Sequence, residues 1–111
     1  MPLCFIYTNL KSECFGEDFE ENFISCLADT LSKPKDRITV ILNAGSRMTY
    51  AGEKQDGVLC QIHSIGVFDQ ERNPDYFHKL CSWLSAETKL EPSRITLQFI
   101  DLPAHMVKKG L

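Results

Sequence analysis

The sequence predicts an α/β (α+β) fold in which duplicated β-α-β units form a four-stranded mixed sheet with two helices on one face. The order strand, helix, strand occurs twice within 111 residues, over the pseudo-repeats 1–45 and 57–103. The two helix-to-strand joints also match, because Lys33-Pro34-Lys35-Asp36-Arg37-Ile38-Thr39 resembles Glu91-Pro92-Ser93-Arg94-Ile95-Thr96. Two helices can cover only one face of such a sheet. We therefore expect residues 1–111 to form a single domain with internal pseudo-symmetry.

The first half of the chain contains a strand, a helix and a second strand. Residues 2–9 are rich in β-branched and aromatic side chains, which favours a strand. From Asp18 to Ser32, apolar or small residues recur at spacings of three and four, as in an amphipathic helix. They are Phe19, Phe23, Cys26, Leu27, Thr30 and Leu31. Pro34 ends this helix, and Ile38 to Leu42 forms the next strand.

The second half repeats this order after a loop from Gly45 to Gly57. Val58 to Ile65 is a strand that Gly66 closes. Asn73-Pro74-Asp75 predicts a helix start with Asn73 as the N-cap residue and Pro74 at the first helical position. The predicted apolar stripe consists of Phe77, Leu80, Cys81, Leu84 and Thr88, and Trp83 is assigned to packing alone. Ile95 to Ile100 forms the last strand.

Alternation along the predicted strands divides their side chains between two faces. The helices would cover Ile38, Val40, Leu42, Ile95, Leu97 and Phe99. The opposite face would carry Thr39, Ile41, Thr96, Gln98 and Ile100. This face is too apolar to be fully exposed to solvent and too polar to belong to the core of a monomer, so it predicts a subunit interface.

Composition excludes several classes of partner. A net charge of −3 provides no basic field for nucleic acid, and paired exposed aromatic residues on the central strands, typical of an RNA-binding module of this topology, are missing. No apolar run approaches the roughly 20 residues of a membrane span, which argues against membrane insertion. Thr8, Asn9 and Lys11 interrupt the first apolar stretch before a signal-peptide core is complete, which predicts a cytoplasmic protein.

The cysteines and histidines predict neither a disulfide framework nor a metal site. The five cysteines are odd in number and never occur as Cys-x-x-Cys, so we expect reduced and largely buried thiols. The three histidines are neither closely spaced nor paired with nearby cysteines. No metal and no cofactor is expected.

The start of the chain is a candidate reactive group. If Met1 is trimmed, Pro2 begins the first strand with a free secondary amine. An α-amine has a pKa of about 7.7–8.0, so modest desolvation or a neighbouring cation makes it neutral near pH 7. The alternative is that a proline is merely tolerated at the first position of a strand.

Four short motifs resemble the macrophage migration inhibitory factor and D-dopachrome tautomerase family of the tautomerase superfamily. They are Met1-Pro2, Thr8-Asn9, Lys33-Pro34 and His63-Ser64-Ile65-Gly66, and the resemblance covers essentially the whole chain. It implies the duplicated β-α-β fold, assembled as a homotrimer with active sites at subunit boundaries. Arg37, the lone cysteine in Gly57-Val58-Leu59-Cys60, and Thr96 with Gln98 favour the D-dopachrome tautomerase-like branch.

The resemblance also implies an isomerase with a defined set of site residues. Pro2 would be the catalytic base of a cofactor-free keto–enol tautomerase acting on phenylpyruvate- or dopachrome-type substrates, once Met1 is removed. Lys33 and Arg37 would bind a substrate carboxylate, Ser64 and Ile65 would supply backbone N–H groups and a wall, and Val107 fits the family pattern. Thr96 and Gln98 replace a Tyr and an Asn that line the pocket from the adjacent subunit.

Some of these roles have structural alternatives. Lys33 can stabilise the dipole at a helix C-terminus, Arg37 can hold its joint as Arg94 does in the repeat, and Ser64 can simply end a strand. Lys109 stands where an aromatic residue is common, and the chain stops at Leu111 without the usual tail. These departures keep open a second function, that of a cytokine-like ligand for a cell-surface receptor, secreted without a signal peptide.

Overall fold

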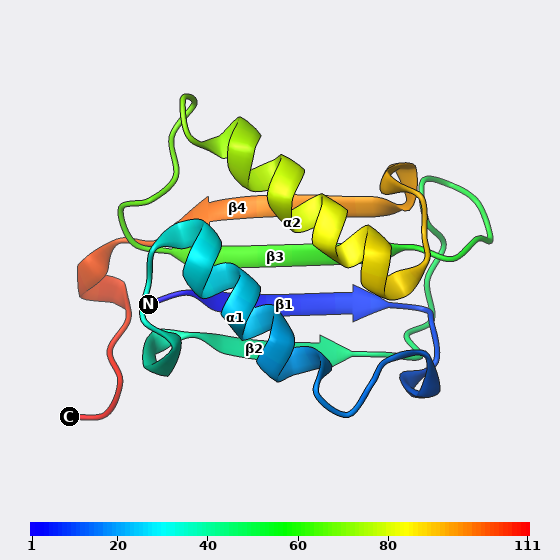
Figure 1. The fold of residues 1–111 in the computed structure, drawn as a ribbon, viewed down its shortest axis with the longest axis horizontal. Helices are drawn as coiled ribbons and strands as arrows, with labels where there is room; N and C mark the ends of the chain where they lie inside the picture. The colour runs from blue at the N-terminus through cyan, green and yellow to red at the C-terminus, as the bar shows by residue number, and fades with distance from the viewer.

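The computed structural model describes all residues, 1–111, and has the predicted four-stranded mixed sheet. The strands are β1 (Leu3–Thr8), β2 (Thr39–Asn43), β3 (Val58–Ser64) and β4 (Ile95–Asp101), in the spatial order β2-β1-β3-β4. Helices α1 (Phe19–Leu31) and α2 (Asn73–Thr88) lie across the same face (Figure 1). The predicted architecture is confirmed.

The sheet has the pseudo-symmetry that the two joints predicted. β1 pairs parallel with β2, β3 pairs parallel with β4, and the two central strands pair antiparallel. Both joints fold as a single 3-10 turn, η2 (Lys35–Arg37) and η3 (Pro92–Arg94), and lead directly into a strand. The repeated sequence therefore encodes a repeated piece of backbone.

The core lies between the helices and the sheet. Of the six residues that the strand pattern assigned to this face, Ile38 and Ile95 are buried in the core, and the other four (Val40, Leu42, Leu97 and Phe99) are partly buried and pack against it. Its members are Cys4, Ile6, Phe19, Phe23, Leu27, Leu31, Ile38, Val58, Cys60, Ile62, Val67, Tyr76, Leu80, Leu84 and Ile95. Trp83 bridges the two helices by packing against Phe19 and Phe23, with ring centroids 5.5 and 4.9 Å away. All five cysteines are free thiols, of which Cys4 and Cys60 are buried.

Two details of the predicted second helix are wrong. Asn73 is not the N-cap residue, because the helix already includes it and its side-chain oxygen accepts a hydrogen bond from the N–H of Asp69. The carboxylate of Asp69 instead accepts the N–H groups of Glu71 and Arg72 in the preceding turn. Phe77 is not part of the buried stripe, since its side chain is 38% exposed.

The correction at Phe77 follows from the helical repeat. The buried residues of α2 are Tyr76, Leu80, Leu84 and Thr88, each four positions after the last. Phe77 therefore lies at the edge of this stripe, where its ring stacks on Phe99 with centroids 4.1 Å apart.

The other face of the sheet carries the side chains that alternation placed there. Residues Thr39, Ile41, Thr96, Gln98 and Ile100 share this face with Leu3, Phe5 and His63, as the strand register requires. Neither helix covers it (Figure 1), and Ile41 on the edge strand β2 is 44% exposed. Neither helix has the length and hydrophobicity that a membrane-spanning helix requires.

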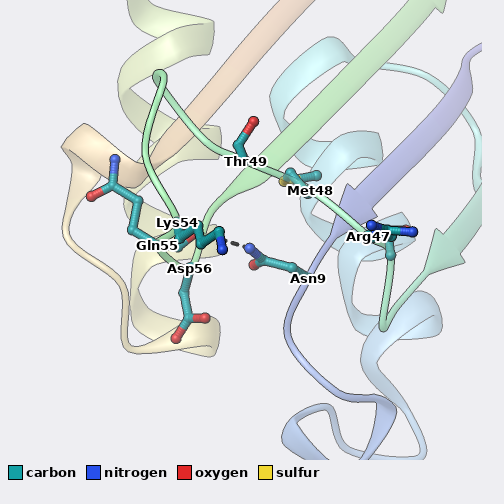
Figure 2. A pocket seen from close by; sticks show the side chains of 8 residues that line it. Asn9, Arg47, Met48, Thr49, Lys54, Gln55 and Asp56 are labelled. Atoms are coloured by element: carbon teal, nitrogen blue, oxygen red, sulfur yellow. Dashed lines mark hydrogen bonds between the residues drawn. The ribbon is translucent and has the colours of Figure 1, made fainter.

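The loop between β2 and β3 is held by two polar residues at the end of β1, Thr8 and Asn9. The Asn9 amide donates to the carbonyl of Gln55 at 2.8 Å (Figure 2). The same amide accepts the N–H of Gly57 at 3.0 Å. The Thr8 hydroxyl donates to the Gly57 carbonyl at 2.9 Å. The family-like Thr8-Asn9 motif thus has a structural function in this chain.

Replacing Asn9 with Ala should destabilise the protein by about 1–3 kcal/mol, because the N–H of the buried Gly57 loses its partner. Urea unfolding at fixed protein concentration measures the change. Asn22→Ala is the control, since Asn22 is exposed and its side chain makes no hydrogen bond, and it should change the free energy of unfolding by less than about 0.5 kcal/mol. Equal effects of the two substitutions would show that the Asn9 contacts contribute nothing.

Candidate active site

A cavity of about 400 Å³ lies at the end of the sheet where the chain begins. The amino terminus and the carboxy-terminal segment meet at this end (Figure 1). Its apolar lining residues are Met1, Ile65 and Val107, and its charged lining residues are Asp36, Arg37, Lys108 and Lys109. Four distant parts of the chain therefore build one cavity next to Pro2.

Pro2 lies beneath Met1 in a fixed position. Its side chain is fully buried, and its carbonyl oxygen accepts the N–H of Thr39 at 3.1 Å. Because β1 is paired on both sides, with Leu3 opposite Thr39 and His63, the backbone at Pro2 has little freedom. While Met1 is attached, the nitrogen of Pro2 is an amide without a basic lone pair.

Lys33 reaches the same end of the sheet from the end of α1. Ser32 adopts the left-handed conformation with φ 55°, and the N–H of Lys33 bonds to the carbonyl of Ala28, so the chain turns sharply at this point. The Nζ of Lys33 then donates to the carbonyl oxygen of Ile65 at 3.4 Å. This contact brings an ammonium group to a wall residue of the cavity.

The surroundings of the amino terminus lower the pKa of its α-amine. Partial burial lowers the pKa of the Met1 α-amine, and the nearby positive charges of Lys33 and then Arg37 lower it further. A terminal amine at this place therefore loses its proton more easily than one in water.

The two arginines of the repeated joint differ in their contacts. Arg94 donates to the carbonyl oxygen of Asp56 at 3.1 Å and so ties η3 to the loop before β3. The side chain of Arg37 makes no hydrogen bond within the chain, and Arg37 lines the cavity. The structural contact that Arg94 makes at its joint is therefore not repeated at Arg37.

The remaining predicted residues divide into two groups. Ile65 and Val107 line the cavity, whereas Ser64 does not. The Ser64 side chain is buried on the helix-covered face with its hydroxyl unpaired, and its carbonyl accepts the N–H of Leu102 at 2.9 Å. Its contacts fit the end of a strand.

Thr96 and Gln98 do not reach this cavity within one chain. Both lie on the uncovered sheet face, where Thr96 shares a hydrogen bond with the Tyr50 hydroxyl at 2.6 Å and Gln98 accepts one from Gln61 at 2.8 Å. The register places Thr96 beside Leu59, near the start of β3, while Ser64 at the cavity end pairs with Asp101.

Three charged lining residues were missing from the predicted site, Asp36, Lys108 and Lys109. A sequence signal existed for each. Asp36 directly precedes Arg37 in the repeated joint, and Lys108 forms a dibasic pair with Lys109 after Val107.

A larger cavity, of about 840 Å³, lies at the opposite end of the sheet. Figure 2 shows its lining side chains, which come from the loop before β3 and from the end of β1. Only Asn9 belongs to the family-like motifs, and its amide is already bonded to the loop. Neither cavity contains a group of His, Cys, Asp and Glu side chains suited to hold a metal ion.

Comparison with known proteins gives a consistent result over the whole chain. The family model described as macrophage migration inhibitory factor (MIF) matches residues 1–110. Macrophage migration inhibitory factor of Rattus norvegicus is 30% identical over 104 residues, covering 94% of this chain and 90% of the relative. D-dopachrome decarboxylase of Xenopus tropicalis is 32% identical over 110 residues, covering 98% and 93%. The chain is thus about equally similar to both kinds of relative.

Solved structures show the same fold. The macrophage migration inhibitory factor of Trichinella spiralis superposes with a TM-score of 0.92 at 23% identity, covering 97% of this chain and 96% of that one. That of Oncomelania hupensis gives a TM-score of 0.93 at 21% identity, covering 99% and 80%.

Proposed function

Because the chain belongs to the macrophage migration inhibitory factor family, we propose that it is a cofactor-free keto–enol tautomerase of phenylpyruvate- or dopachrome-type substrates. The catalytic base is the Pro2 amine, which removal of Met1 sets free. The observation that carries this proposal is the position of Met1, which lines the cavity above the buried Pro2. Without Met1, the proline nitrogen borders this cavity. A relative that is 32% identical bears the name D-dopachrome decarboxylase, which supports the choice of substrate class.

The proposed reaction moves one proton. The neutral Pro2 nitrogen takes a proton from the carbon next to the keto group, and the electron pair of that C–H bond forms the carbon–carbon double bond. The carbonyl oxygen takes up the electron pair of its π bond and receives the proton that Pro2 returns, which gives the enol and leaves Pro2 neutral again. An amine whose pKa lies near the working pH is suited to both directions, because it accepts and returns the proton readily.

The positive charges have two functions in this scheme. Together with burial, they disfavour a positive charge on a terminal amine at this place, as they do for the Met1 amine, whose pKa they lower. Lys33 and Arg37 also bind the substrate carboxylate, and a guanidinium does so with two parallel hydrogen bonds. Ile65 and Val107 form the apolar wall, and we assign the backbone N–H of Ile65, which lines the cavity, to the substrate oxygen.

We further propose that the protein is a homotrimer. The open sheet face, on which Ile41, Thr96 and Gln98 lie, needs a partner that the chain itself does not supply. In the trimer, Thr96 and Gln98 of a neighbouring subunit would line the Pro2 cavity, which they do not reach within one chain.

A second candidate function is signalling through a cell-surface receptor. It is supported by the names of the relatives from rat and mouse, which are macrophage migration inhibitory factors. The protein would then be made in the cytoplasm and secreted without a signal peptide. Tight receptor binding by a protein with no measurable turnover would favour this function over the enzyme.

Replacing Lys33 with Ala should lower kcat/KM for phenylpyruvate. The expected rise in the apparent barrier is about 1–3 kcal/mol, the size of a charged hydrogen bond. Burial and the nearby cations lower the pKa of the Met1 amine, and we expect the same direction for a free Pro2 amine. The parent enzyme should then lose activity as the pH falls through this pKa, because protonation removes the base. Without Lys33 this pKa rises toward its ordinary value, so the acidic limb should move to higher pH. Profiles of kcat/KM against pH measure both effects.

The control for this prediction is thermal unfolding, which Lys33→Ala should change little because the lost contact is with the substrate. Identical profiles for the variant and the parent would remove Lys33 from the site. Lost activity that only reflects a lower melting temperature would do the same.

Light scattering should give three times the 12.6 kDa mass of one chain at micromolar concentration. Ile41→Asp should shift the mass toward the monomer, because it places a charge in the predicted interface. Ala86→Asp adds the same charge at an exposed position of α2, far from that face, and should leave the mass unchanged. A monomeric parent protein would contradict the proposed trimer.

A further inference from the structure

The cavity at Pro2 carries more positive charge than one substrate carboxylate needs. Its charged lining consists of three cationic side chains, from Arg37, Lys108 and Lys109, and one carboxylate, from Asp36. The ammonium group of Lys33 adds a further positive charge through its contact with Ile65. No aromatic ring belongs to the lining, so the side chains of this chain offer more to an anion than to an aromatic ring.

The cations come from two separate parts of the chain. Lys33 and Arg37 flank the joint between α1 and β2, whereas Lys108 and Lys109 belong to the carboxy-terminal segment. That segment is fixed at its start by the bond from the N–H of Leu102 to the carbonyl of Ser64, and a further bond from Met106 to Pro103 closes the turn η4 (Ala104–Met106). The two groups of cations therefore border one cavity from different walls.

One carboxylate satisfies one of these groups and leaves the other without a counter-charge. A substrate with two carboxylates can engage both, and a volume of about 400 Å³ is large enough for a small dicarboxylic acid. Charge-assisted hydrogen bonds to carboxylates are among the stronger polar contacts in proteins. The second carboxylate would also replace the hydration that the lysines lose when the cavity fills.

We propose that Lys108 and Lys109 form a second carboxylate subsite and that the preferred substrates are dianionic 2-keto acids. This inference rests on the proposed tautomerase function. The second carboxylate is not changed in the reaction, since it only holds the substrate while Pro2 moves the proton. Asp36 opposes this preference, because it is the one negative side chain in the lining.

The test compares two substrates that differ by one carboxylate, phenylpyruvate and 4-carboxyphenylpyruvate, on protein from which Met1 has been removed. The measured quantity is the ratio of their kcat/KM values, with the uncatalysed rates subtracted. We expect the ratio to favour the dianion by about tenfold or more, the effect of one charge-assisted contact. The double substitution Lys108→Gln and Lys109→Gln should bring the ratio close to one.

Two further variants sharpen the result. Asp36→Asn should raise the ratio, because it removes the opposing charge. Lys35→Gln is the matched control, since Lys35 is an exposed lysine of the same turn, η2, but does not line the cavity. Lys35→Gln should leave the ratio unchanged. This result would show that the preference for the dianion comes from contacts in the cavity and not from the net charge of the protein.

The possible failures are distinguishable. If phenylpyruvate is turned over but the ratio is near one, or is unaffected by the lysine substitutions, the second subsite does not exist while the tautomerase function stands. If neither substrate is turned over, the proposed function fails, and calorimetry with terephthalate and benzoate decides about the subsite. Tighter binding of the dianion, lost in the double variant, would support the subsite, and equal binding would overturn it.

Discussion

The pairing of β1 on both sides is the constraint on which the site depends. A chain that begins in the middle of a sheet has its first residues held by two ladders, parallel with β2 and antiparallel with β3. Pro2 is therefore buried and fixed, although residues so close to a terminus are commonly mobile. A terminal amine at this position is partly desolvated, which is the main cause of the lowered pKa at Met1.

The two pseudo-symmetric halves of the fold differ at the start of their first strands, because only β1 begins at the chain terminus. Both halves have a 3-10 turn with an arginine before the second strand, but β3 is entered from a loop and has no free amine. At that end, Arg94 and Asn9 hold the loop through Asp56 and Gly57. At the other end, the side chain of Arg37 makes no hydrogen bond within the chain and lines a cavity. The two joints thus share a backbone conformation, but only the arginine of the second joint ties it to a neighbouring loop.

The fold was predictable because local patterns alone determine it. Spacings of three and four located both helices, alternation assigned the strand faces correctly, and the repeated joints indicated the duplication. The errors arose where tertiary contacts decide the outcome. Asn73 is a residue type that is common at N-caps, but its side-chain oxygen accepts a hydrogen bond from the N–H of Asp69 instead. Phe77 lies one position beside the buried stripe of α2, and its ring stacks on Phe99.

The site was predictable only in part. Motif resemblance named Pro2, Lys33, Arg37, Ile65 and Val107, which the structure brings to one end of the sheet. Asp36, Lys108 and Lys109 adjoin predicted residues in the sequence, but only the approach of two distant segments brings them into the same cavity. Thr96 and Gln98 do not reach the cavity within one chain, so the site roles proposed for them require a neighbouring subunit.

The most direct measurement is the turnover of phenylpyruvate by two forms of the same protein, one with Met1 removed and one that retains it, each verified by intact mass. We expect activity only in the form without Met1, because only there is the Pro2 nitrogen a basic amine. Equal activity in both forms would exclude Pro2 as the catalytic base and contradict the proposed mechanism.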